Sequence, residues 1–246
     1  MDSQSLPKQS LPTGTFRYSA VNVEDLGATE YTLVTIAVDE SGSTYGFQKD
    51  MENSIKQIVE SCKSSPRSDF LLLRLLAFSD NVREIHGFNE LVNCKLSDYD
   101  DCLNDGGCTA LFKAAKNAID VTANYGETLF DSDFDVNAVI FIVTDGMDNR
   151  SGQITAVSVK NSLNKVIRAE KLESMLSVLI GVGIGDQSQA QQYLDEFKDK
   201  SGLSQFINIE NADAKTLAKL ADFVSKSISS QSNSLGSGGS SQPLTF

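Results

Sequence analysis

The strongest constraint on the fold is a set of four nearly uninterrupted apolar runs, separated by segments with helical periodicity. Strands that are apolar on both sides are typical of a sheet covered on both faces. Strands that alternate with helices indicate parallel crossover connections. We therefore predict an α/β fold, with a doubly wound, mostly parallel sheet of about six strands and helices on both faces. The four runs lie at 31–38, 70–78, 137–143 and 175–184.

Two weaker segments complete the predicted sheet. Residues 82–88 follow a Ser-Asp-Asn turn after the second run, which predicts a hairpin and therefore one antiparallel edge strand. Residues 205–209 form a short strand-like segment late in the chain. Apolar residues with a helical period predict the helices between the strands. These predicted helices cover 47–62, 110–124, 154–173, 190–200 and 214–228.

Composition divides the chain into three parts. Residues 1–28 are polar, and we predict an N-terminal arm that contains one short strand over 16–23. Residues 29–228 carry the alternating pattern and form the predicted folded domain. Residues 229–246 are rich in Ser and Gly, which predicts a flexible tail.

The charge of the chain narrows the range of partners. The net charge is −12, and a surface this acidic repels the phosphate backbone of nucleic acids. No apolar run approaches the roughly 18 residues of a membrane span. The first ten residues have neither a basic leader nor an apolar core, so they do not resemble a signal peptide. We expect a cytoplasmic protein that binds neither nucleic acid nor membrane.

The cysteines leave two interpretations open. The sequence has four of them, and three lie with the single histidine between positions 86 and 108. Their spacing does not match a paired CxxC zinc motif. Reduced thiols in an intracellular protein explain them more simply than a zinc site. The residues concerned are Cys62, Cys94, Cys102, Cys108 and His86.

Oxygen-bearing side chains follow two of the predicted strands and begin one predicted helix. Asp39 ends the first apolar run, and Ser41 and Ser43 follow it. Asp145 follows the third run, and Thr109 begins the helix before that run. Ligands of doubly wound sheets bind at the carboxyl ends of the strands. We therefore expect these five residues to meet at one edge of the sheet.

This set of residues suits a hard divalent cation. Mg²⁺ prefers near-octahedral oxygen ligands and keeps some of its water. Hydroxyl ligands are neutral, so a cation held mainly by them remains able to bind an anionic ligand from outside, such as a partner's Glu or Asp. Asp39, Ser41 or Ser43 could instead cap the following helix, but capping does not explain why five donors converge from three loops.

These motifs resemble the metal-ion-dependent adhesion site (MIDAS) of von Willebrand factor A domains. The match is Asp39-x-Ser41-x-Ser43, then Thr109, then Asp145 within Thr-Asp-Gly. The segments TIAVDESGS, GGCTALFKA, VIFIVTDGMDN and LIGVGIGD resemble the family too, and the likeness covers roughly residues 29–228. It implies a non-enzymatic module in which the five residues hold Mg²⁺ (or Mn²⁺ or Ca²⁺) and a partner protein supplies the acid.

The resemblance also suggests a setting. Intracellular A domains similar to this one, of the prokaryotic tellurite-resistance type, are often encoded beside an AAA ATPase or beside a protein kinase and a phosphatase. This implies a regulatory role in a stress or defence module, with one of those proteins as the partner.

The acidic residues around the motif have no fixed role in the sequence. Asp98, Asp100, Asp101 and Asp105 precede Thr109. They form either a solvated surface loop or a rim that selects a partner with basic residues around its acid. Glu40 occupies the variable position of the first motif, and we assign it no ligand role.

Two other functions remain open. Asp39 could be the nucleophile of an aspartate-based phosphatase, although Ser41 stands where those enzymes carry a second acid. Alternatively, the domain could be a scaffold or assembly subunit that binds without metal.

Overall fold

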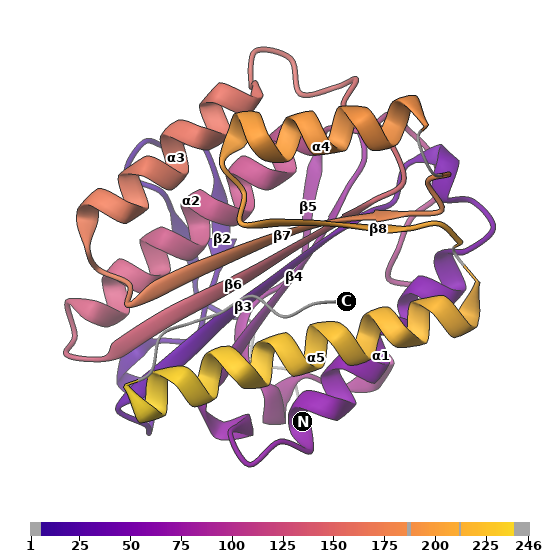
Figure 1. The fold of residues 1–246 in the computed structure, drawn as a ribbon. Coiled ribbons are helices and arrows are strands. Elements are labelled where there is room, and N and C mark those ends of the chain that lie inside the picture. Colours follow the sequence, from indigo (N-terminus) through magenta and orange to yellow (C-terminus); the bar gives the residue numbers. More distant parts are fainter. Residues whose placement is uncertain (1–5, 186–187, 212, 239–246) are drawn as a thin grey trace.

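The computed structural model describes residues 6–185, 188–211 and 213–238. Its centre is a six-stranded sheet of strand order β5-β4-β3-β6-β7-β8 (Figure 1). All neighbouring pairs are parallel except β4 and β5, so the predicted sheet with one antiparallel edge strand is confirmed. The strands are β3 (Glu30–Asp39), β4 (Leu71–Phe78), β5 (Val82–Glu90), β6 (Asp135–Thr144), β7 (Ser174–Val182) and β8 (Gln205–Ile209).

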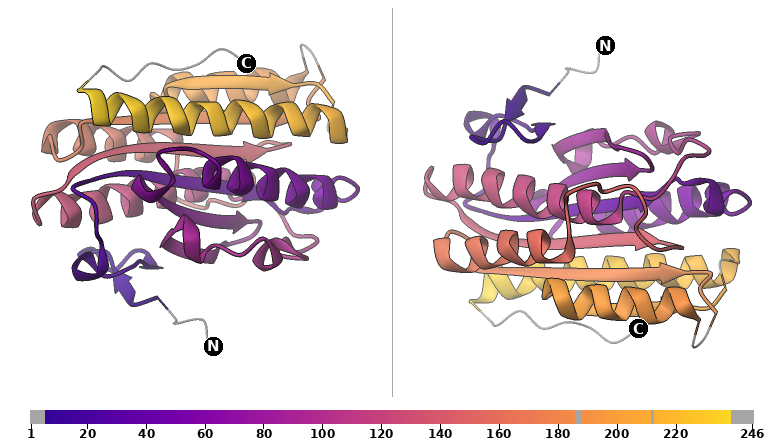
Figure 2. Two further views of the ribbon diagram at one scale, coloured as in Figure 1. Left: turned by 90° about the horizontal axis from the view of Figure 1, so that it is seen from below. Right: turned by 90° about the horizontal axis from the view of Figure 1, so that it is seen from above.

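Helices cover both faces of this sheet, as predicted, and Figures 1 and 2 show the two helical layers. Along β3, Val34, Ile36 and Val38 pack into the core under α1 and α5, whereas Ala37 packs under the other layer. One face carries α1 (Gln48–Lys63) and α5 (Ala214–Ser237), and the other carries α2 (Leu111–Phe130), α3 (Ala156–Ala169) and α4 (Gln189–Ser201).

The N-terminal arm is folded against the sheet. Its strands β1 (Lys8–Ser10) and β2 (Arg17–Ser19) pair antiparallel, so the single strand predicted over 16–23 is in fact the second strand of a short hairpin. Tyr18 lies edge-on to Tyr125 of α2, with ring centroids 6.4 Å apart. Tyr125 in turn stacks on Phe88 of β5 at 5.0 Å. The arm therefore contributes to a third apolar cluster.

Helix α5 continues past the predicted start of the tail at residue 229. Ser232 is fully buried, and its hydroxyl accepts a hydrogen bond of 3.1 Å from Nε of Arg67. The carbonyl of Gln231 accepts one of 2.8 Å from Asn137 on β6. The predicted boundary is therefore too early, because hydrogen bonds to the sheet and to the loop before β4 hold a segment that has few apolar residues. Residues 239–246 of the predicted tail lie outside the described residues.

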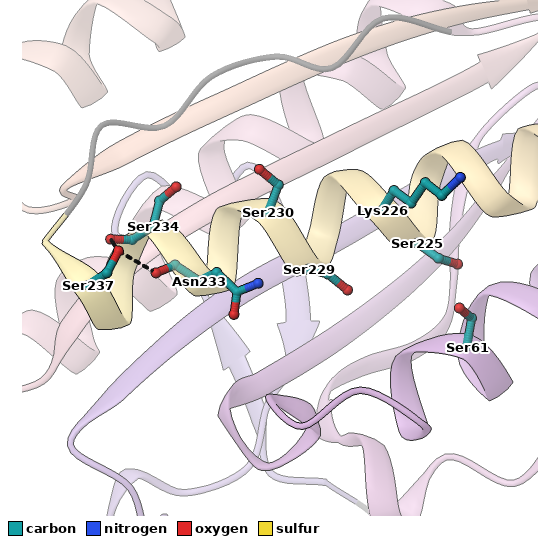
Figure 3. Close-up of a pocket in the computed structure, with 8 residues that line it drawn as sticks. All are labelled: Ser61, Ser225, Lys226, Ser229, Ser230, Asn233, Ser234 and Ser237. Carbon is teal, nitrogen blue, oxygen red and sulfur yellow. Dashed lines mark hydrogen bonds between the residues drawn. The ribbon is translucent and has the colours of Figure 1, made fainter.

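Figure 3 shows the serine side chains along this part of α5. Serines line a depression of about 470 Å³ between α5 and Ser61 of α1. The Ser237 hydroxyl donates to the Asn233 carbonyl at 2.8 Å. Serine hydroxyls in helices often bond in this way to the carbonyl four residues earlier. The depression is thus a hydroxyl-rich helix surface.

Two other helices differ from their predicted bounds. Helix α2 is longer than predicted because Leu129 in its last turn is fully buried. Helix α3 is shorter. It begins after Thr155, whose hydroxyl accepts from the Ser158 amide, and ends where Glu170 turns left-handed with φ 50°. None of the helices in the described ranges is both long enough and apolar enough to cross a membrane.

Candidate metal centre at the carboxyl edge of the sheet

Two adjacent parallel strands set the position of the site. The register pairs Val38 of β3 with Val143 of β6, so Asp39 and Thr144 end the two strands side by side. The chain then turns through a short 3-10 helix at Gly42–Thr44 after β3, and Asp145 follows β6. The doubly wound topology thus brings together two motifs that are distant in the chain.

Four of the five predicted residues lie in one hydrogen-bonded cluster. The Ser43 hydroxyl donates to Oδ1 of Asp145 at 2.8 Å and lies 3.2 Å from the Ser41 hydroxyl. The Ser41 amide donates to Oδ1 of Asp39 at 2.9 Å. Oδ2 of Asp39 accepts a hydrogen bond of 2.6 Å from Thr144, a partner that the sequence motif did not single out. The motif residues therefore converge.

The fifth residue, Thr109, lies in a loop that is hydrogen-bonded to the two other loops of this edge. The carbonyl of Gly107 accepts from the Gly42 amide at 3.3 Å, which places the Thr109 loop against the serine turn. The Thr109 amide donates to Oδ1 of Asn149 at 2.7 Å, and its carbonyl accepts from the Asn149 amide at 2.9 Å. Within the described ranges, no hydrogen bond joins the Thr109 hydroxyl to the other four residues. Its role as a ligand remains a prediction.

The electrostatics of the cluster favour a cation. Asp39 is only 3% exposed, and desolvation raises its pKa to about 6, although hydrogen bonds from Ser41 and Thr144 oppose the rise. Desolvation also raises the pKa of Asp145. Neither carboxylate has a Lys or Arg partner among the described residues. Two adjacent acids without a basic partner are the donor set that a divalent cation would neutralise, so the residues present fit such an ion.

The ligands are mixed rather than purely acidic. The described part of the chain contains no group of three or more His, Cys, Asp or Glu residues arranged to hold a metal. Two acids and neighbouring hydroxyls match the ligand preference of Mg²⁺ for oxygen.

The loop after β6 also caps helix α2. Oδ1 of Asp148 accepts from the Phe112 amide at 3.1 Å, and the Ser151 hydroxyl accepts from the Lys113 amide at 2.9 Å. The residue before α2 provides no side-chain N-cap bond, so these acceptors satisfy orphan amides of its first turn. No local pattern in the sequence indicates this role. The capping residues follow β6, whereas the amides that they cap lie at the start of α2, before that strand.

Replacing Asp148 with Ala should weaken the fold. The Phe112 amide would lose its acceptor, and we expect the free energy of unfolding to fall by about 1–3 kcal/mol. Urea unfolding in EDTA measures the change. Asp195→Ala on α4 removes an exposed acid that forms no hydrogen bond or ion pair within the described ranges, and it should stay within about 0.5 kcal/mol of wild type. Equal losses in the two variants would mean that Asp148 does not cap α2.

Glu40 has a structural role beside the site. Its side chain is buried and pairs with Arg83 at 2.6 Å, and it accepts from the Asn104 amide at 2.7 Å. Glu52 of α1, also buried, accepts from the Leu103 amide at 3.1 Å. These two acids hold the loop that precedes Thr109.

Part of the acidic stretch in this loop is already neutralised. Asp100 pairs with Lys56, and Asp101 pairs with Lys49 at 3.0 Å. Asp98 accepts from the Lys95 amide. Oδ1 of Asp105 lies 3.4 Å from the side-chain nitrogen of Gln48. The stretch is therefore a loop bound to α1, rather than four free charges around the site.

The single imidazole is also engaged. His86 Nε2 lies 3.0 Å from the Tyr99 hydroxyl, and Nδ1 lies 2.9 Å from the Gly87 carbonyl. Burial lowers the pKa of His86. Cys62 and Cys94 are buried free thiols. The zinc interpretation thus loses its only histidine ligand.

The six-stranded sheet with helices on both faces agrees with the fold that the sequence resemblance implies. No family model matches the sequence, and no curated protein matches it. The likeness appears among solved structures.

Three structures illustrate the likeness. Proximal thread matrix protein 1 from the mussel byssus is 18% identical, with TM-score 0.53, over 80% of this chain and 45% of that one. It has also been solved with a zinc-occupied MIDAS motif. The PilB minor pilin of Streptococcus sanguinis is 14% identical, with TM-score 0.59, over 87% of this chain and 64% of that one. BatB from Bacteroides thetaiotaomicron is 13% identical, with TM-score 0.50, over 79% of this chain and 98% of that one.

This likeness shows the fold. The chain spans less than two thirds of the length of the mussel and pilin chains.

Proposed function

We propose that this protein is a metal-dependent protein-binding module. In this proposal Asp39, Ser41, Ser43, Thr109 and Asp145 hold Mg²⁺, with Mn²⁺ or Ca²⁺ as substitutes, and a Glu or Asp of a partner protein completes the site. The observation that carries the proposal is the hydrogen-bonded cluster of two carboxylates and two hydroxyls, which has no basic partner within the described residues.

The residues around the site would have different roles in binding the partner. A bound divalent cation would supply positive charge for one carboxylate oxygen of the partner. Asp39, which is buried, would compensate that charge, while the exposed Ser43 turn would face the partner. Tyr45 is 72% exposed and Met147 is 37% exposed, and each lies shortly after one member of the Ser43–Asp145 hydrogen bond in the chain. They offer apolar contacts to side chains next to the partner's acid.

Binding explains the site better than catalysis. Both carboxylate oxygens of Asp39 accept hydrogen bonds from this chain, and Ser41 stands where an aspartate-based phosphatase would have its second acid. A test of phosphatase activity is incubation with Mg²⁺ and p-nitrophenyl phosphate. Turnover by wild type that disappears in Asp39→Asn would replace the binding proposal with an enzymatic one.

The cellular setting rests on the family resemblance alone. An AAA ATPase, or a kinase and phosphatase encoded nearby, are the partners that the resemblance suggests. A cytoplasmic location and a regulatory role in a prokaryotic stress or defence module belong to the same proposal.

Calorimetric titration with Mg²⁺ and with Mn²⁺ tests whether the site binds a divalent cation. We expect saturable binding to wild type with one ion per chain, weakened about tenfold or more in Ser41→Ala because a direct ligand is lost. Ser229→Ala, which removes a serine hydroxyl from the depression on α5, should bind as wild type does. Equal, negligible heats for all three proteins would favour the metal-independent scaffold.

A further inference from the structure

Helix α3 has a composition unlike that of the rest of the chain. The chain has 33 acidic and 21 basic residues, yet α3 contains three basic residues and no acidic one. These are Lys160, Lys165 and Arg168. Within the described ranges, none of them forms an ion pair. A cationic, unpaired strip on a protein of net charge −12 has no role in the proposed metal site.

Apolar side chains lie on the same outer face. Few large hydrophobic residues of the described chain are exposed, and two of them are Val157 (60%) and Ile167 (71%) on α3. Val157, Lys160, Asn164 and Ile167 are spaced by three, four and three residues, which places them on one ridge of the helix. The ridge is about 15 Å long, with an exposed aliphatic side chain at each end.

Grooves flank the C-terminal half of this ridge. One, of about 290 Å³, lies between α3, α2 and the β1–β2 loop and includes Leu11, Lys165 and Val166. The other, of about 410 Å³, lies toward the start of β7 and includes Ile167 and Met175 together with two acids, Glu170 and Glu173. Figures 1 and 2 show α3 in the layer with α2 and α4, where its C-terminus reaches the end of the sheet opposite the metal centre.

We propose that the outer face of α3 is a second protein-docking surface that binds an acidic amphipathic helix of a partner. Charge complementarity with Lys160, Lys165 and Arg168 selects an acidic occupant along the helix itself, because the two acids of the flanking groove lie beyond the last residue of α3. The aliphatic side chains at the two ends of the ridge and the flanking grooves select one with apolar side chains, because ridges of one helix pack into the grooves of another. A second copy docked α3 to α3 would bring like charges together. Phosphate-bearing partners would meet the repulsion of the remaining surface, and they offer no side chains for the grooves.

The test uses the whole chain in EDTA, so that its result does not depend on the metal centre. The probe is a synthetic helical peptide of about 18 residues, with Leu at positions i, i+3, i+7 and i+10 and Glu at the flanking positions. We expect saturable binding with amide shift changes in the NMR spectrum concentrated on α3. The triple variant Lys160→Glu, Lys165→Glu and Arg168→Glu should weaken binding about tenfold or more.

Two further variants and a control peptide test whether binding depends on the outer face of α3. The variant Lys95→Glu, Lys215→Glu and Lys219→Glu changes the net charge equally at exposed sites elsewhere, and it should bind within about twofold of wild type. Ile167→Ser tests the apolar contact without adding a charge, and it should weaken binding while changing the melting temperature little, because the residue is exposed. A scrambled peptide of the same composition should bind weakly.

Several results would overturn the proposal. These are equal binding of the scrambled peptide, shift changes away from α3, or no binding of the helical peptide. Phosphatidylserine vesicles or duplex DNA that perturb α3 where the peptide does not would instead assign the face to lipid or nucleic acid.

Discussion

Replacing Asp39 with Asn should make the protein more stable in EDTA while removing its response to Mg²⁺. Desolvation raises the Asp39 pKa from 3.8 to about 6, so the folded state holds this proton over a pH range in which the unfolded chain has released it. Between these values, stability falls as the pH rises, because the buried carboxylate must ionise. Above pH 6 the ionised form is disfavoured by on the order of 3 kcal/mol.

The side-chain amide of the Asp39→Asn variant would carry no such charge, and it fits the same space. Its oxygen can still accept from the Ser41 amide, and its nitrogen can donate to the Thr144 hydroxyl. The free energies of unfolding of the two proteins should therefore be similar near pH 4 and diverge in favour of the variant up to pH 6 and beyond. Saturating Mg²⁺ should stabilise wild type alone, by about 2.7 kcal/mol at a hundredfold excess over Kd.

Urea unfolding across this pH range, with EDTA or Mg²⁺, measures both effects. Asp148→Asn provides a matched acid-to-amide change in the same loop region, at a carboxylate that the proposal does not use as a ligand. An Asp39→Asn protein that is less stable than wild type in EDTA at pH 7 would contradict the desolvation argument. One that still gains stability from Mg²⁺ would contradict the assigned ligand.

Replacing Gly87 with Ala should detach the N-terminal arm from β5. A Cβ at this position would overlap the carbonyl carbon and oxygen of Ser19 in β2. Backbone atoms cannot yield as a flexible side chain can, so either β5 or the arm must move. We expect a loss of about 3 kcal/mol in stability, and faster tryptic cleavage at Arg17.

Gly27→Ala is the matched control, since nothing lies within 4 Å of its added Cβ. Its stability should change by less than about 0.5 kcal/mol. A Gly87→Ala protein with wild-type stability and wild-type cleavage at Arg17 would show that the arm is not packed against β5.

The sequence predicted the sheet well because burial on both faces leaves a strong signal. The run at 31–38 lies within β3, and the antiparallel β5 followed from the turn at 79–81. The convergence of Asp39, Ser43 and Asp145 followed from topology, since parallel strands deliver their carboxyl ends to one edge.

The features that the sequence did not predict depend on partners far away in the chain. The end of α5 is polar, and it is ordered through Arg67 and Asn137 rather than through an apolar face of its own. Asp148 caps a helix to which it does not belong. Such contacts have no local periodicity, so a pattern within one segment does not reveal them.

The bonds between the loops at the carboxyl edge have a consequence for recognition. Gly42 is joined to Gly107, Thr109 to Asn149, and Ser43 to Asp145, so three separate connections form one braced rim. The conformational entropy of arranging that rim is lost when the chain folds, not when a partner arrives. Under the proposed function, a partner's acidic side chain should then dock without loop rearrangement, at a rate limited by approach and orientation.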